Sequence, residues 1–125
     1  MPRQDARVLV VEDEALIRIN IADYLEEAGY GVVEAANADE AIGILVTHPS
    51  IHLLFTDIEM PGSMDGLRLA SVVRDRWPPV QIIIASGHRE PGAGEIPLGG
   101  RFFRKPYNDR EIANAVSELL GPELG

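Results

Sequence analysis

Short apolar runs alternate along this chain with longer segments in which apolar residues recur at helical spacing. The runs are rich in valine, isoleucine, leucine and phenylalanine, as expected for strands that are buried on both faces of a sheet. They cover residues 8–11, 31–36, 51–56, 80–85 and 101–104. Strands that alternate with helices predict an α/β fold, with a parallel sheet, right-handed crossovers and helices on both faces.

Four segments predict amphipathic helices, because their apolar residues fall on one stripe. They are Glu14–Ala28, Ala38–Thr47, Gly66–Trp77 and a final helix that begins after Asn108 and ends near Leu120. Asn37 and Asn108 are expected to cap the second and last of these helices, since an asparagine side chain accepts hydrogen bonds from free backbone N–H groups.

The segment Gly87–Gly100 departs from this alternation, because it is rich in glycine and proline, which are poor helix formers. We expect the fourth helix of the fold to be short or irregular, with at most one helical turn near Ala93–Leu98. No repeat, low-complexity tract or linker divides the sequence. We therefore expect a single domain over residues 1–125, with its core at about residues 7–120.

Composition narrows the classes of function. The net charge of −9 weighs against direct nucleic-acid binding, which needs cations on the protein. The absence of cysteine excludes disulfide and thiol chemistry. No apolar run approaches the roughly 20 residues of a membrane span, and the first residues do not resemble a signal peptide. We expect a cytoplasmic protein that binds neither membranes nor nucleic acid.

Charged or hydroxylated side chains follow four of the apolar runs. Glu12 and Asp13 follow the first, Asp57 the third, Ser86 the fourth and Lys105 the fifth. The carboxyl ends of parallel strands share one edge, where open α/β sheets place their chemistry. Three carboxylates and one ammonium group at that edge suggest a divalent cation and a phosphoryl group.

Four motifs carry a family resemblance. Val-Leu-Val-Val-Glu-Asp-Glu (residues 8–14), Thr-Asp-Ile-Glu-Met-Pro (56–61), Ala-Ser-Gly (85–87) and Lys-Pro-Tyr (105–107) together resemble the receiver domain of bacterial two-component response regulators. The resemblance implies a flavodoxin-like (CheY-like), doubly wound sheet of five parallel strands in the order 2-1-3-4-5. Each motif alone has a plainer interpretation as a turn or a helix start, but their order at successive strand ends favours the receiver.

The resemblance implies a role for each polar residue of the predicted edge. Asp57 is the phospho-acceptor, and Lys105 places a cation against the phosphoryl oxygens. Mg²⁺, or Mn²⁺, is held by Asp13 and Asp57, by the backbone carbonyl of Glu59, and by Glu12 nearby.

The resemblance also implies a switch. After phosphorylation the Ser86 hydroxyl would donate to the new oxygens, and Phe102 would turn into the space that Ser86 leaves. The peptide bond before Pro106 is expected to be cis. Glu59 and His88 stand at two variable positions beside the pocket, where they should set the lifetime of the aspartyl phosphate, with no sign predicted.

Leu16 and Ile19 lie off the apolar stripe of the first helix, so we expect them to be exposed beside the acidic pocket. By resemblance they would dock a histidine kinase or a histidine phosphotransfer protein. Scattered apolar residues are also common on protein surfaces, and this is the alternative. The altered segment Gly87–Gly100 casts doubt on the family's usual dimer face, so we expect a monomer or weak dimer.

We expect a stand-alone receiver that signals to an unknown downstream protein, because no output domain occurs within the 125 residues. It would not be an enzyme beyond slow hydrolysis of its own acyl phosphate. Two other functions stay open. One is a pseudo-receiver that binds partners without phosphorylation, which the intact pocket disfavours. The other is a Mg²⁺-dependent aspartyl phosphatase with Glu59 as its general acid, which the lack of an obvious cap or substrate pocket disfavours.

Overall fold

Five parallel strands form one sheet in the order β2-β1-β3-β4-β5 in the computed structural model, which describes residues 6–48, 50–92 and 94–121. The strands are β1 (Arg7–Val11), β2 (Gly31–Ala35), β3 (Ile51–Asp57), β4 (Gln81–Ser86) and β5 (Arg101–Arg104). The predicted strand order is confirmed, and every strand begins and ends within one residue of its predicted bounds.

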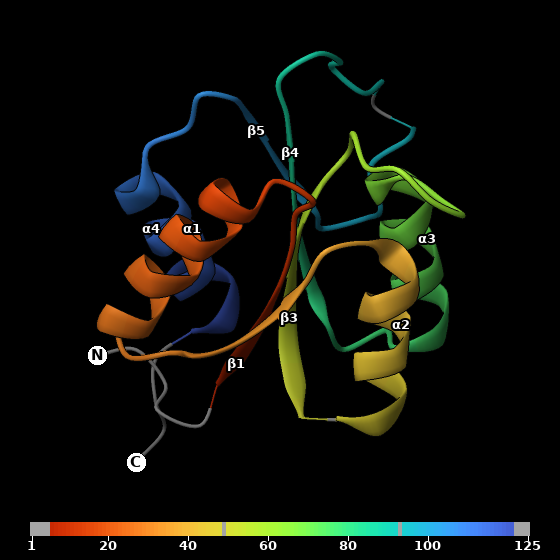
Figure 1. The fold of residues 1–125 in the computed structure, drawn as a ribbon. Helices are drawn as coiled ribbons and strands as arrows, with labels where there is room; N and C mark the ends of the chain where they lie inside the picture. Colours follow the sequence, from red (N-terminus) through yellow and green to blue (C-terminus); the bar gives the residue numbers. More distant parts are fainter. Residues whose placement is uncertain (1–5, 49, 93, 122–125) are drawn as a thin grey trace.

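Two pairs of helices cover the two faces of this sheet (Figure 1). The first face carries α1 (Ala15–Glu27) and α4 (Asp109–Leu120), and the second carries α2 (Ala38–Thr47) and α3 (Gly66–Arg76). As predicted, the side chains of Asn37 and Asn108 cap α2 and α4. None of the helices in the described part of the chain has the length and apolar character that a membrane span requires.

The sheet divides the apolar core into two layers. Leu54 and Ile84 belong to the layer beneath α2 and α3, whereas their chain neighbours Phe55 and Ile83 belong to the layer beneath α1 and α4. Successive side chains of a strand point to opposite faces, so a continuous apolar run fills both layers. This is why the central strands β1, β3 and β4 are mostly apolar and do not alternate strictly with polar residues.

The start of α3 is pressed against the end of β3. The Gly66 N–H donates a 2.9 Å hydrogen bond to the Ile58 carbonyl, and a Cβ atom on Gly66 would lie 1.8 Å from the carbonyl oxygen of Asp57. Only a residue without a side chain allows the two backbones to approach this closely. The side chain of Asp65 caps the helix by accepting a 2.9 Å hydrogen bond from the Arg68 N–H. The position of α3 is therefore tied to the backbone of the predicted phospho-acceptor.

Turns and bends connect β4 to β5, and the described residues of this connection contain no helix. The prediction of an irregular fourth helix is confirmed; Ala93, where one helical turn was allowed, lies outside the described residues. The Glu95 carboxylate accepts a 3.0 Å hydrogen bond from the Gly92 N–H and pairs with Arg89. Pro91 is buried, whereas Leu98 is exposed. The connection is thus held by local contacts in place of helical hydrogen bonds.

Candidate functional site

Acidic and basic side chains meet at the carboxyl ends of β1, β3 and β5. Carboxylate oxygens of Glu12, Asp13 and Asp57 lie within 4.8 Å of one another. Lys105 Nζ lies 2.7 Å from Glu12 Oε1 and 3.1 Å from Asp57 Oδ1. A cavity of about 270 Å³ opens between Asp13, Asp57, Lys105 and His88. The structure therefore brings together the residues that the sequence placed at successive strand ends.

Burial sets the electrostatics of this cluster. The side chains of Glu12 and Asp57 are almost inaccessible, at 2% and 4% exposure. Burial and the negative charge of Glu12 raise the pKa of Asp57 to about 6, although Lys105 opposes the rise. Burial likewise raises the pKa of Glu12 above its usual value. Burial alone would lower the pKa of Lys105. The carboxylates of Glu12 and Asp57 stabilise its ammonium form more strongly, so the pKa of Lys105 is raised.

One ammonium group does not balance three carboxylates, and the cluster retains an unsatisfied oxygen. Asp57 Oδ1 is buried and accepts no well-aligned hydrogen bond from the described residues, although Lys105 Nζ is 3.1 Å away. Buried polar atoms normally have a partner. Carboxylate oxygens are the ligands that hard divalent cations prefer, and a cation would supply both the missing charge and the missing partner. The donor set formed with Asp13 therefore fits Mg²⁺ or Mn²⁺.

Ser86 lies at the end of β4 with 1% exposure, and its hydroxyl group is fully engaged. Its Oγ donates a 2.6 Å hydrogen bond to Glu59 Oε2 and accepts hydrogen bonds from the N–H groups of His88 and Arg89. The other carboxylate oxygen of Glu59 accepts a hydrogen bond from the Gly87 N–H. Sequence reasoning gave Glu59 a backbone role and a place beside the pocket, and it missed this side-chain contact.

Phe102 lies on β5 beside Ile84 of β4, and its half-buried ring packs against the apolar layer beneath α2 and α3. Ile96, from the connection between β4 and β5, packs against the same layer. The rotation of Phe102 stays a prediction. The peptide bond between Lys105 and Pro106 is cis, as the resemblance implies.

The outer face of α1 carries the two apolar residues singled out in the sequence. Leu16 is 79% exposed and Ile19 is 43% exposed, so their predicted exposure is confirmed, whereas their role in docking stays a prediction.

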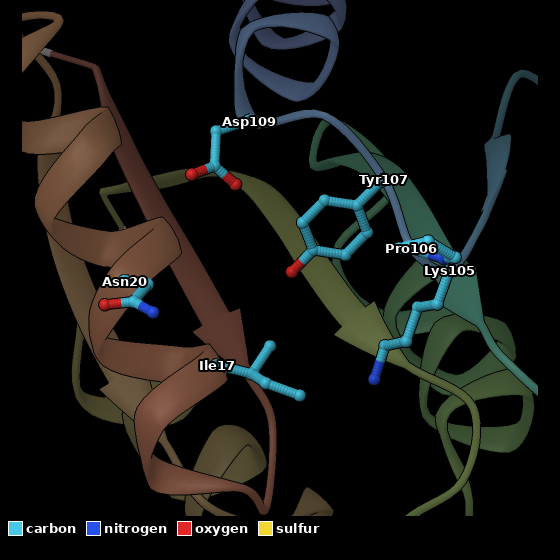
Figure 2. A pocket seen from close by; sticks show the side chains of 6 residues that line it. All are labelled: Ile17, Asn20, Lys105, Pro106, Tyr107 and Asp109. Carbon is cyan, nitrogen blue, oxygen red and sulfur yellow. The ribbon is translucent and has the colours of Figure 1, made fainter.

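A cavity of about 410 Å³ lies between α1 and the connection from β5 to α4 (Figure 2). Its lining residues are Ile17, Asn20, Lys105, Pro106, Tyr107 and Asp109. The Tyr107 hydroxyl points toward α1 in Figure 2, and the ring stands edge-on to Phe55 with centroids 5.7 Å apart. Sequence reasoning identified α1 as a contact surface but not this cavity, because the cavity depends on how two distant segments pack.

Comparison with known proteins agrees with this geometry. The family model described as the response regulator receiver domain matches residues 8–117. An NtrX-like response regulator of Rickettsia bellii is 37% identical over 109 residues, which are 84% of this chain and 23% of that protein. The sensor kinase CckA of Brucella abortus is 34% identical over 119 residues, which are 92% of this chain and 12% of the kinase. The chain thus spans less than a quarter of the length of these curated relatives.

Solved structures share the fold over nearly the full chain. The receiver domain of the hybrid histidine kinase CckA is 33% identical with a TM-score of 0.78, over 92% of this chain and 99% of that domain. A response regulator receiver domain protein from Clostridium thermocellum is 27% identical with a TM-score of 0.84, over 92% of this chain and 94% of that one.

Proposed function

The chain belongs to the family of response regulator receiver domains, which act in two-component signalling, and on this premise we propose that Asp57 accepts a phosphoryl group from a histidine donor. The observation that carries the proposal is the position of Lys105 Nζ, 3.1 Å from a buried Asp57 oxygen that has no aligned hydrogen bond. An acceptor for a negatively charged group needs both an available oxygen and a nearby cation.

The proposed step is a displacement at phosphorus. A carboxylate oxygen of Asp57 forms the new P–O bond while the P–N bond of phosphohistidine breaks, and the histidine nitrogen keeps the electron pair. The attacking carboxylate must be ionised, and a pKa of about 6 leaves Asp57 mostly ionised at neutral pH. Lys105 is placed to offset charge on the transferring oxygens.

We propose Glu12, Asp13 and Asp57, with the backbone carbonyl of Glu59, as the residues that hold Mg²⁺ or Mn²⁺. When bound, the ion reduces the repulsion between the carboxylate and the incoming phosphoryl group. The clustering of the three carboxylates within 4.8 Å supports this assignment.

The proposed donor is a histidine kinase or a histidine phosphotransfer protein that docks on α1. Exposed Leu16 and Ile19, with the cavity beside Tyr107, support this surface. The similarity to a receiver domain from a hybrid histidine kinase supports a phosphohistidine donor. We propose that the receiver works in the cytoplasm, which suits a sequence without cysteine, and that it signals to a downstream protein.

We further propose that the receiver has no enzymatic activity beyond slow hydrolysis of its own acyl phosphate. The general acid of an aspartyl phosphatase would have to be free to reach a substrate. The Glu59 carboxylate instead accepts hydrogen bonds from Ser86 and Gly87, which weighs against that role.

Intact-mass measurement after incubation with acetyl phosphate and Mg²⁺ tests the proposal, and a phosphorylated histidine donor provides a second arm. We expect one added phosphoryl group, lost in Asp57→Asn and retained in Asp23→Asn, which changes an exposed acid on α1. Wild-type protein that stays unmodified with both donors would refute the proposed function.

A further inference from the structure

Glu59 lies two residues after Asp57, and its carboxylate contacts the end of β4. Its Oε2 accepts a 2.6 Å hydrogen bond from the Ser86 hydroxyl, and its Oε1 accepts a 3.2 Å hydrogen bond from the Gly87 N–H. A length of 2.6 Å falls in the range of O–H donors to ionised oxygens, which form bonds about twice as strong as those between neutral groups.

The Ser86 hydroxyl has no second proton to give. A serine Oγ carries one donor and two acceptor positions. The N–H groups of His88 and Arg89 take the acceptor positions, at 3.3 Å and 3.0 Å, and Glu59 takes the proton. With Ser86 1% exposed, water has little access to replace these partners. Any new acceptor in the cavity must therefore displace Glu59.

Asp57 and Glu59 line the same cavity of about 270 Å³, together with Gly87. A phosphoryl group on Asp57 would place new negatively charged oxygens within that space. These oxygens and the Glu59 carboxylate would then need the same hydroxyl proton, and they would also repel each other.

We propose that Glu59 is a positioning residue that holds the Ser86 hydroxyl in the unphosphorylated state and competes with the phosphoryl oxygens on Asp57 for its proton. This inference rests on the proposed function, because it requires a phosphoryl group on Asp57. The contact between Glu59 and Ser86 stabilises the resting arrangement, so it lowers the fraction of phosphorylated molecules in which Ser86 has moved.

A double-mutant cycle of Glu59→Ala and Ser86→Ala tests the competition, with beryllofluoride and Mg²⁺ as the phosphoryl mimic and the Kd measured by calorimetry. We expect Glu59→Ala to tighten beryllofluoride binding by roughly tenfold or more, the effect of one net hydrogen bond to a charged group. In the Ser86→Ala background the same substitution should change the Kd no more than Glu14→Ala does. Glu14 lines the same cavity, so this control measures the effect of charge alone.

Glu59→Gln is a second test that separates the effect of the hydrogen bond from that of the charge, and it leaves Ser86 intact. The glutamine carbonyl can still accept the hydroxyl proton, but in a weaker bond between neutral groups, so we expect a Kd between those of the wild type and of Glu59→Ala. A readout without beryllofluoride is the amide NMR spectrum of the free protein. Glu59→Ala should shift the Gly87, His88 and Arg89 resonances, and Glu14→Ala should not.

An equal effect of Glu59→Ala in both backgrounds overturns the inference, because Glu59 would then act without Ser86. The same holds if Glu59→Gln behaves like Glu59→Ala. Failure of the two proposals is distinguishable in this design. Wild-type protein that binds no beryllofluoride refutes the proposed function, whereas a wild type that binds but shows no coupling refutes only the competition.

Discussion

The buried carboxylate of Asp57 should destabilise the metal-free protein at neutral pH, and Asp57→Asn should remove that cost. The pKa of Asp57 is about 6 in the folded protein, against an ordinary value of 3.8. Between these two values the folded state binds more protons than the unfolded state. The free energy of unfolding therefore falls as the pH rises through this window. The destabilisation is complete above pH 6, and Asp57 has no such effect well below pH 3.8.

The magnitude follows from the difference between the two pKa values. A difference of about two, at about 1.4 kcal/mol for each, gives a loss of about 3 kcal/mol. Solvent screening reduces this loss little, because the Asp57 side chain is only 4% exposed. Asparagine has the same shape without the charge, and Lys105 keeps its 2.7 Å contact with Glu12 in the variant.

Urea unfolding from pH 4 to pH 8 in a chelating buffer, followed by fluorescence of the single tryptophan, measures this effect. Asp57→Asn should be more stable than the wild type by up to about 3 kcal/mol at pH 8, and the two should converge near pH 4. The exposed control Asp23→Asn should stay within about 0.5 kcal/mol at every pH. Mg²⁺ should narrow the gap by stabilising the wild type. If Asp57→Asn shows no advantage at pH 8, or the same advantage at pH 4, the buried charge is not the cause.

Four further substitutions test other parts of the molecule. Gly66→Ala should lower the free energy of unfolding by roughly 1–3 kcal/mol in urea titration, because its Cβ would lie 1.8 Å from the Asp57 carbonyl oxygen. Gly43→Ala, with open space around it inside α2, should instead raise it by roughly 0.5–1 kcal/mol, and a loss at both sites would contradict the close-contact argument. Asp13→Asn should weaken Mg²⁺ binding roughly tenfold or more in calorimetry, since a ligand charge is lost, and an unchanged affinity would remove Asp13 from the ligand set. Leu16→Ala should leave stability within roughly 0.5 kcal/mol and slow phosphorylation by a histidine donor but not by acetyl phosphate; equal slowing with both donors would argue against docking on α1.

The sheet could be predicted from the sequence because its three central strands are buried on both faces. A run such as the one before Asp57 has apolar residues on both of its faces, so it has few alternatives to a central parallel strand. The acidic cluster could be predicted for a related reason. Parallel strands end at one edge, so residues distant in sequence, such as Asp13 and Lys105, must come close together there.

The contacts of the Glu59 side chain could not be predicted in the same way. Its partners lie at the end of β4 and on the turn that follows, and which of them it reaches depends on the rotamer of Glu59 and on the path of that turn. The cavity beside Tyr107 is also a product of packing between α1 and a later connection. Neither feature has a local pattern, because both depend on distances across the folded molecule.

The hydrogen bonds from the His88 and Arg89 N–H groups to Ser86 have a consequence for how this receiver could be recognised. If Ser86 moves on phosphorylation, as proposed, it would pull on the backbone of a glycine- and proline-rich connection, whose described residues form no helix that could move as one body. Such a segment can change its backbone conformation at individual residues. The exposed side chain of Leu98 is an apolar contact whose surroundings would change with it. A partner would then select one conformation of the connection among several, so a single receiver could offer different surfaces to different proteins.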